Sequence, residues 1–276
     1  MRVHHLDCGP MRPFGGSLLD GGPGGPARGA AMCCHVLLVE SPDGLVLVDT
    51  GMSRDDLAHP PGTLGRPFHL LARPRADPRH AAVEQIRGLG LDPAEVTHVL
   101  LTHMDLDHAG GLRDFPEATV HVLGDEFRAA TARRTVPEKA RYVPAQWAHQ
   151  PAWRLHEPTG GDTWFGFDAV APVAGLPDGF ALVPLIGHTR GHAGIAVRSD
   201  RGWLLHAGDA YFHHGALEAE PSVPPLMRVY EARLQTLGKQ RRHNQARLRE
   251  LVAAHGDEVT VFSAHDQAEL DRLRAH

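Results

Sequence analysis

Apolar runs separated by short polar turns predict a chain rich in β-strands. The runs at 33–40 and 45–48 flank the turn residues 41–44 and predict a β-hairpin. The runs at 195–198 and 203–206 predict a second hairpin around Asp-Arg-Gly. Further strands are predicted at 2–7, 97–102, 118–123, 180–186 and 259–263.

Other segments have the spacing of amphipathic helices. After the N-capping pair Asp77-Pro78, apolar residues recur at helical intervals up to Gly90. A helix is also predicted from Gly124 to about residue 134. A basic helix is predicted over about 228–254, broken near Gly238, and a last helix closes the chain. Strands and helices thus alternate in each half of the chain, which is typical of an α/β fold.

Three long segments have no clear periodicity. Residues 9–29 are dense in Gly and Pro, and we expect a solvated connector there, with a flap beside a functional site as the alternative. Residues 59–76 are expected to be a loop. Residues 135–169 are expected to be irregular, and they hold three of the four Trp residues. Their aromatic side chains either anchor the segment to the core or form the wall of a substrate pocket.

The strand at 97–102 leads into a loop that is unusually rich in possible metal ligands. His103, Asp105, Asp107 and His108 lie within six positions, before Gly110-Gly111 and a predicted helix at Leu112. Packing does not explain such a loop, because charged side chains are rarely buried unless they are paired or bound to a metal. The loop therefore predicts half of a metal site.

Other predicted strands also end in imidazole or carboxylate groups. These groups are Asp49, His188, Asp209 and His265. Strand ends at one edge of a layered sheet structure can converge on one cleft. Imidazole and carboxylate together suit zinc, iron or manganese. The number of donors is enough for two divalent metal ions that share one carboxylate.

Composition excludes several other classes of protein. The chain has 28 basic and 33 acidic residues in 276, without long basic blocks, so neither nucleic acid nor a membrane surface is the expected partner. The three cysteines, Cys8, Cys33 and Cys34, form no Cys-x-x-Cys pair, which disfavours a thiolate zinc site. They favour a reduced, cytoplasmic protein. No signal peptide or membrane-spanning segment is expected, and residues 1–276 are expected to form one domain.

The ligand blocks together resemble those of the metallo-β-lactamase superfamily. The resemblance is carried by residues 102–111 (Thr-His-Met-Asp-Leu-Asp-His-Ala-Gly-Gly), 187–192 (Gly-His-Thr-Arg-Gly-His), 208–209, 264–266 and the Asp-Thr-Gly turn at 49–51. These blocks extend over most of the chain. The resemblance implies an αββα four-layer sandwich of two mixed β-sheets with helices outside, and a dinuclear site at one edge.

The resemblance also implies roles for individual residues. One metal would take His103, Asp105 and His188. The other would take Asp107, His108 and His265, with Asp209 bridging the two. His192 and Asp49 would support ligands without binding metal themselves.

One position departs from the usual His-x-His-x-Asp-His pattern, because Asp105 stands where the second His belongs. Flavodiiron proteins of the superfamily carry a carboxylate at that place, but with an added flavin domain that this chain lacks. Zinc is the expected metal. The hard carboxylate ligand shifts the preference toward iron or manganese, and its charge lowers the Lewis acidity of the bound ion.

The resemblance implies a hydrolase that attacks a small organic ester, lactone or thioester with a metal-bridging hydroxide. Asp107 would orient the nucleophile and pass a proton to the leaving group, and Tyr211 is a candidate oxyanion donor. Lactonases of the superfamily have Tyr three residues after the bridging Asp, where this chain has Phe212. Two alternatives stay open: an iron-dependent oxygenase similar to the sulfur dioxygenases, and a non-catalytic metal-binding protein on the same fold. The sequence does not predict the oligomeric state.

Overall fold

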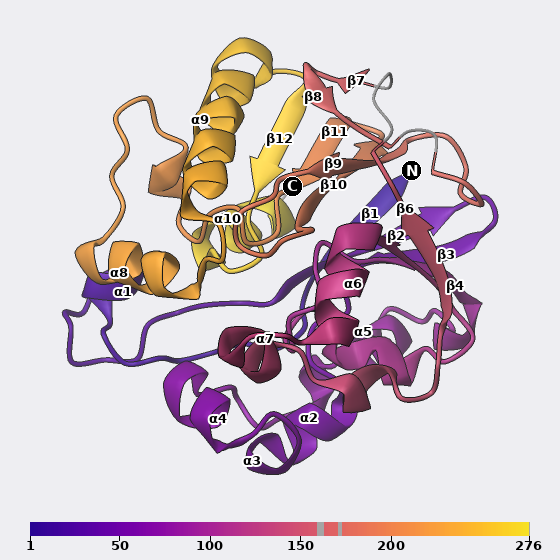
Figure 1. The fold of residues 1–276 in the computed structure, drawn as a ribbon, viewed down its shortest axis with the longest axis horizontal. Helices are drawn as coiled ribbons and strands as arrows, with labels where there is room; N and C mark the ends of the chain where they lie inside the picture. The colour runs from indigo at the N-terminus through magenta and orange to yellow at the C-terminus, as the bar shows by residue number, and fades with distance from the viewer. Residues whose placement is uncertain (159–162, 171–172, 276) are drawn as a thin grey trace.

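A computed structural model describes residues 1–158, 163–170 and 173–275 (Figure 1). The larger of its two main sheets has six strands in chain order, from β1 to β6. Strands β1, β2 and β3 pair antiparallel, whereas β3, β4, β5 and β6 pair parallel. The bounds are β1 (Arg2–Asp7), β2 (His35–Ser41), β3 (Gly44–Val48), β4 (Val96–Leu100), β5 (Thr119–Leu123) and β6 (Ala152–His156).

The second sheet has four strands in the order β12-β11-β10-β9. They are β9 (Phe180–Pro184), β10 (Ala193–Ser199), β11 (Gly202–His206) and β12 (Val259–Phe262), and only the β11–β12 pair is parallel. A small hairpin, β7 (Thr163–Trp164) and β8 (Phe167–Asp168), lies apart. Alternate residues of both main sheets form a shared buried core that includes Leu37, Val48, Leu100, Leu182, Ile195 and Phe262.

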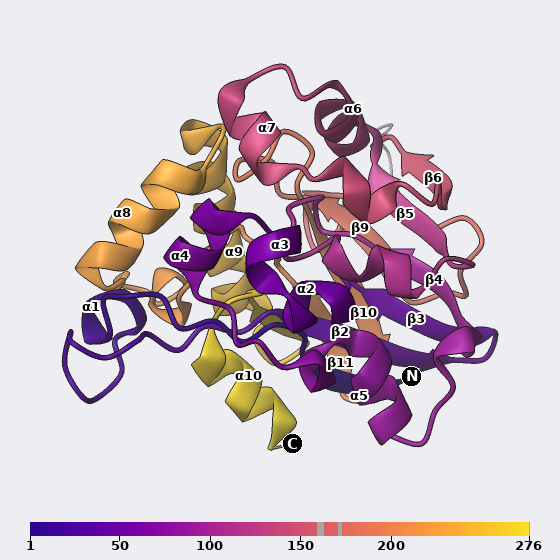
Figure 2. The ribbon, with the colours of Figure 1, turned by 90° about the horizontal axis from the view of Figure 1, so that it is seen from below.

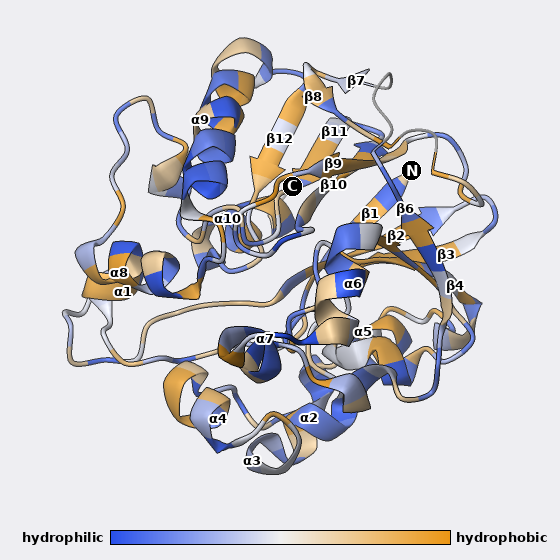
Figure 3. Ribbon diagram, in the orientation of Figure 1, coloured by the Kyte–Doolittle hydropathy of each residue, from blue (hydrophilic) through white to orange (hydrophobic). Residues whose placement is uncertain are grey.

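Helices cover the outer faces of the two sheets. The longest, α9 (Gly238–His255), packs on the smaller sheet, and α5 (Ala82–Gly88) and α2 (Arg54–Ala58) lie on the larger one (Figures 1 and 2). Hydrophobic residues concentrate in the strands, whereas α9 is mostly polar (Figure 3). Two mixed sheets between helical layers confirm the predicted αββα sandwich. Further helices are α1 (Ser17–Asp20), α6 (Gly124–Ala132), α7 (Val136–Arg141), α8 (Pro225–Leu234) and α10 (Gln267–Arg274).

Two segments are more ordered than their composition predicts. Residues 59–76, expected to be a loop, contain α3 (Pro60–Thr63) and α4 (Arg66–Ala72). The segment 135–169, expected to be irregular, contributes α7 and β6, although residues 159–162 lie outside the described part. Strand β6 completes the larger sheet through parallel pairing with β5. Both predictions failed because long-range pairing and packing stabilise segments that lack a local periodic signal.

Among the described residues, no helix is both long and apolar enough to cross a membrane. That residues 1–276 form one domain stays a prediction.

Candidate metal centre

The predicted ligands all follow strands that end at one edge of the sandwich. Asp49 follows β3 and the His103–His108 loop follows β4, and these two strands are parallel neighbours. In the other sheet, His188, Asp209 and His265 follow β9, β11 and β12. These three strands run in the same direction, so their carboxyl ends meet at the same edge. The topology therefore brings together side chains that are up to 216 positions apart in the chain (265 − 49).

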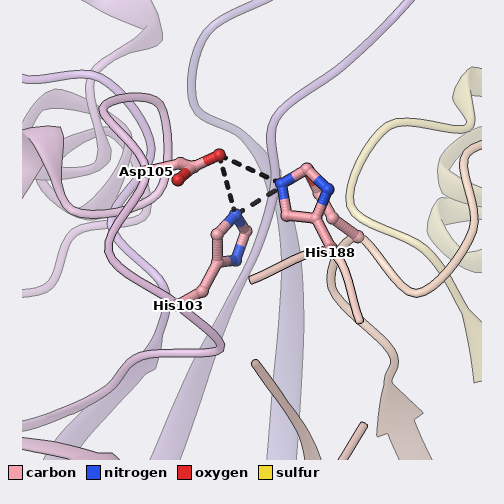
Figure 4. A group of neighbouring side chains, drawn as sticks. His103, Asp105 and His188 are labelled. Carbon is pink, nitrogen blue, oxygen red and sulfur yellow. Dashed lines mark hydrogen bonds and ion pairs between the residues drawn. The ribbon is translucent and has the colours of Figure 1, made fainter. Parts of the chain in front are cut away.

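The first group of donors consists of His103, Asp105, His188 and Asp209, whose ligand atoms all lie within 4.8 Å of one another. His188 Nε2 is 3.0 Å from Asp105 Oδ2 and 3.3 Å from Asp209 Oδ2. His103 Nε2 is 3.5 Å from Asp105 Oδ2 and 3.7 Å from Asp209 Oδ2. Figure 4 shows the two imidazole nitrogens and one Asp105 oxygen pointing toward a common centre.

The second group lies on the other side of Asp209. His108 Nε2 is 3.4 Å and His265 Nε2 is 3.2 Å from Asp209 Oδ1. Asp107 Oδ2 is 3.7 Å from His265 Nε2, and the Cys34 thiol is near both. The two oxygens of Asp209 thus face different groups, which is the geometry of a shared carboxylate.

A network behind the donors sets the tautomers of the imidazoles. Asp49 accepts from His108 Nδ1 at 2.8 Å and from Thr102 Oγ1 at 2.7 Å. Since that hydroxyl gives its proton to Asp49, His103 Nδ1 donates to Thr102 Oγ1 at 3.0 Å. His265 Nδ1 donates to the Cys33 carbonyl at 2.7 Å. All three imidazoles therefore present the lone pair of Nε2 to the donor groups.

Asp49 and His192 contact candidate ligands from outside the two donor groups. His192 Nδ1 donates to the Leu185 carbonyl, and its Nε2 accepts from the backbone N–H of Asp209 at 2.9 Å. Gly208 has φ +53°, and a Cβ there would lie 2.5 Å from His192 Nε2. Only glycine therefore fits before Asp209.

Glu126 ties the two main ligand loops together, and no sequence pattern predicts this role. The buried carboxylate accepts from the Met104 backbone N–H at 3.0 Å and from the Gly191 N–H at 3.1 Å. A Cβ at Gly191 would lie 2.1 Å from the Glu126 backbone nitrogen, so the glycine of this block allows the close approach.

Burial and charge act in opposite directions on the carboxylates of the cluster. Burial alone would raise the pKa of Asp209, but His265, His108 and His188 outweigh it and hold the pKa well below its usual range. Burial would likewise raise the pKa of Asp105, yet the Arg141 guanidinium and His103 lower it strongly. Both groups are therefore anionic, as metal ligands require.

The structure contradicts one assigned role. Tyr211 is fully buried and donates its hydroxyl to the Glu269 carboxylate at 2.9 Å, away from the donor groups, so it is not placed to be an oxyanion donor. Tyr230 of α8 is another phenol near the cluster, which it reaches through Phe212 and His265. Burial raises the pKa of Tyr230, and the carboxylates of Asp107 and Asp209 raise it further. Its ring makes an edge contact with Phe212, whose own ring stacks on His265.

A cavity of about 290 Å³ opens beside His265 and Phe212. Asp20, Gly22, Pro23 and Arg28 of the Gly/Pro-rich segment line it. The expectation that residues 9–29 form only a solvated connector is therefore wrong. The segment lies beside the site because α1 packs against α8 (Figure 2), which places the following loop over the cavity.

Comparisons with known proteins show which family the chain is similar to. Residues 33–126 match the family model of the metallo-β-lactamase superfamily. Proteins named probable metallo-hydrolases from Mycobacterium bovis and Mycobacterium tuberculosis are each 43% identical to this chain, over 96% of it and 80% of their own length. An N-acyl homoserine lactonase of Rhizobium johnstonii is 36% identical, but over only 34% of this chain and 35% of its own.

Solved structures show the same fold at low sequence identity. A variant of B. thuringiensis AiiA with N-decanoyl-L-homoserine at its active site superimposes with a TM-score of 0.72 at 19% identity, and the match covers 98% of this chain and 95% of the other. An N-acyl homoserine lactone hydrolase with N-hexanoyl-L-homoserine at its catalytic metal centre has the same score, identity and coverage. Together with the family model and the two metallo-hydrolase relatives, these findings show that the chain belongs to the metallo-β-lactamase superfamily, as a metal-dependent hydrolase.

Proposed function

We propose that this hydrolase cleaves a small organic ester, lactone or thioester, with two divalent ions held in the two donor groups. The observation that carries the proposal is the position of Asp209, whose two oxygens face the two groups beside an open cavity. The proposed ligands of the first ion are His103, Asp105 and His188, and those of the second are Asp107, His108 and His265, with Asp209 shared between them.

The donors fit such ions in their chemistry. Within the described residues, His103 Nε2 and Asp209 Oδ1 are buried without a hydrogen-bond partner. His108 Nε2 and His265 Nε2 both present lone pairs and are only 3.3 Å apart, an arrangement that a cation between them stabilises. We propose zinc as the metal, with iron or manganese as alternatives because Asp105 is a carboxylate.

Divalent ions at these positions supply Lewis acidity, which makes water acidic enough to react near neutral pH. The protein contributes the remaining proton transfer. Asp107 is the proposed residue that orients the attacking water and carries its proton to the leaving group. Its side chain is 12% exposed, whereas that of Asp209 is 4% exposed, so Asp107 is the more accessible carboxylate of the second group.

Tyr230 is the proposed donor to the developing oxyanion, in the role that sequence reasoning gave to Tyr211. Its high pKa keeps the hydroxyl protonated, so the phenol donates a hydrogen bond where negative charge develops.

The cavity favours a substrate with an apolar part and no net negative charge. Phe212, Met32 and Met227 supply its apolar surface. Its cationic residue, Arg28, is already paired with Asp20, with two contacts of 2.6 Å, so it offers little net charge to an anionic ligand. The names of the lactonase relative and of the solved lactonase structures support lactones as the first substrates to test.

Metal analysis combined with a substrate panel tests the proposal. Purified protein loaded with zinc, manganese or iron is assayed against matched esters, lactones, thioesters and phosphodiesters. We expect two ions per chain at saturation and hydrolysis within the first three classes. One iron per chain with oxygen consumption would instead identify an oxygenase, and a fully metallated protein that hydrolyses none of these substrates would refute the proposal.

A further inference from the structure

Arg141, the last residue of α7, contacts the first donor group directly. Its Nη1 donates to Asp105 Oδ2 at 2.7 Å and to His188 Nε2 at 2.9 Å. Its Nη2 donates to the Leu234 carbonyl at the end of α8. The side chain is only 12% exposed, so the guanidinium is enclosed between two helix ends and the donor group.

The atoms that Arg141 contacts are the ones that would bind a metal. Neutral imidazole has a single lone pair, on the ring nitrogen without a proton. If His188 Nε2 accepts from Arg141, it has no electron pair left for an ion. The Asp105 oxygen that Arg141 contacts is the one that points toward His103 and His188 (Figure 4). A guanidinium stays charged at all relevant pH values, so it also repels a cation that approaches these atoms.

A residue that only supported the ligands would contact the ring nitrogen or carboxylate oxygen that does not face the metal. The other ligating imidazoles are held in that way, with His108 Nδ1 on Asp49 and His265 Nδ1 on the Cys33 carbonyl. His188 differs, because its buried Nδ1 has no partner in the described part of the chain. Asp105 Oδ1, the oxygen that Arg141 does not contact, also has no partner in the described part of the chain. Arg141 is thus on the metal side of both ligands.

We propose that Arg141 competes with the first metal ion for Asp105 and His188. The protein then holds one divalent ion tightly in the second group, and a second ion enters the first group only when the Arg141 side chain withdraws. This inference depends on the proposed function, since it concerns the occupancy of the same two groups. The inference also explains why Asp105 stands where the usual pattern has His. A carboxylate forms an ion pair with a guanidinium, whereas a neutral imidazole does not.

The same arrangement makes the two groups unequal before any ion binds. Arg141 contacts neither His108 nor His265. The contacts of these two imidazoles are with Asp209, Asp49, Asp107, the Cys33 carbonyl and each other. In the singly loaded protein, the guanidinium supplies the positive charge that faces Asp105 and His188 of the first group.

Zinc titration against a chromophoric chelator tests the inference without measuring activity. Wild-type protein is expected to bind one ion tightly and a second at least about 100-fold more weakly. Arg141→Met removes the competing charge but keeps an apolar stem of similar length, and it should tighten the second ion at least about tenfold. The matched control is Arg190→Met, which removes a cation that pairs with Glu138 of the same helix α7 and touches no ligand. It should leave both affinities unchanged.

Three results would overturn the competition. Two equally tight ions in the wild-type protein would do so, and this measurement does not depend on whether a variant folds. Weaker binding of the second ion in Arg141→Met would show that Arg141 supports the ligands. An equal change in Arg190→Met would show that the effect comes from removing any nearby positive charge and not from competition for the ligands. Two tight ions with normal hydrolysis would leave the proposed function intact, whereas failure of all three proteins to bind zinc would overturn both.

Discussion

Replacing Asp49 with Asn is the sharpest test of how the fold prepares the metal ligands. Asp49 has φ +57°, a backbone conformation that Asn also adopts readily, so the substitution introduces no new backbone strain. Asn keeps the oxygen that accepts from the Thr102 backbone N–H at 2.7 Å. It replaces Oδ2, which accepts from both His108 Nδ1 and Thr102 Oγ1, with an amide that donates.

The expected consequence is a change of tautomer at two ligands. His108 Nδ1 would have to accept from the new amide, so its proton moves to Nε2, the nitrogen that faces Asp209. Thr102 Oγ1 would accept as well, and its own proton would then turn toward His103 Nδ1. Loss of such an orienting partner typically weakens metal binding about 10- to 100-fold, or about 1.4–2.7 kcal/mol, and here it acts on both ions.

The assay is chelator competition with zinc, supported by the visible absorption of bound cobalt. The matched control is Asp56→Asn, which removes another fully buried carboxylate, the one that caps α2 with Ser53 rather than supporting a ligand. It should keep the affinities of the wild-type protein. If Asp49→Asn binds both ions within twofold of the wild type, the assignment of the tautomers through Asp49 and Thr102 is wrong.

Three further predictions follow from the same structure. Asp209→Ala should lose both ions or hold one weakly, and elemental analysis that finds two ions per chain would contradict the proposed bridging role. Tyr230→Phe should lower kcat about 100-fold with unchanged metal content, whereas Tyr211→Phe should leave kcat within a few-fold; the reverse pattern in steady-state kinetics would restore Tyr211 as the oxyanion donor. Burial and His156 lower the pKa of His121 to about 3, so the unfolded chain, with an ordinary histidine pKa near 6.5, binds the proton more readily and stability falls as the pH drops below that value. At pH 5 this lowers the free energy of unfolding by about 2 kcal/mol relative to pH 7.5. His121→Leu should remove about 2 kcal/mol from the difference between the unfolding free energies measured with urea at the two pH values. An unchanged difference would show that His121 is not the group responsible.

Local patterns predicted most of the elements near the site. The hairpins around residues 41–44 and 200–202 and the break near Gly238 are all present, because turn residues and short apolar runs act over a few positions. The helix predicted at Leu112 is only a short 3₁₀ turn, Gly110–Asp114. Strand β6 and helices α3 and α4 were missed, because their stability comes from contacts with distant segments.

The sequence by itself determined which donor types follow which strands, since a strand and the turn after it are encoded by neighbouring residues. The resemblance of these blocks to the metallo-β-lactamase superfamily then predicted the sandwich and the seven candidate ligands. Only the tertiary structure decided which side chains face the cluster. Tyr211 and Tyr230 are both tyrosines, so the sequence does not tell them apart. In the fold, Tyr211 is buried against Glu269, whereas α8 packs Tyr230 against Phe212, whose ring stacks on His265. Arg141 shows the same limit, because its contact with Asp105 and His188 joins residues 36 and 47 positions apart. Such contacts depend on how helices pack against strand ends, and no local pattern in the chain records that packing.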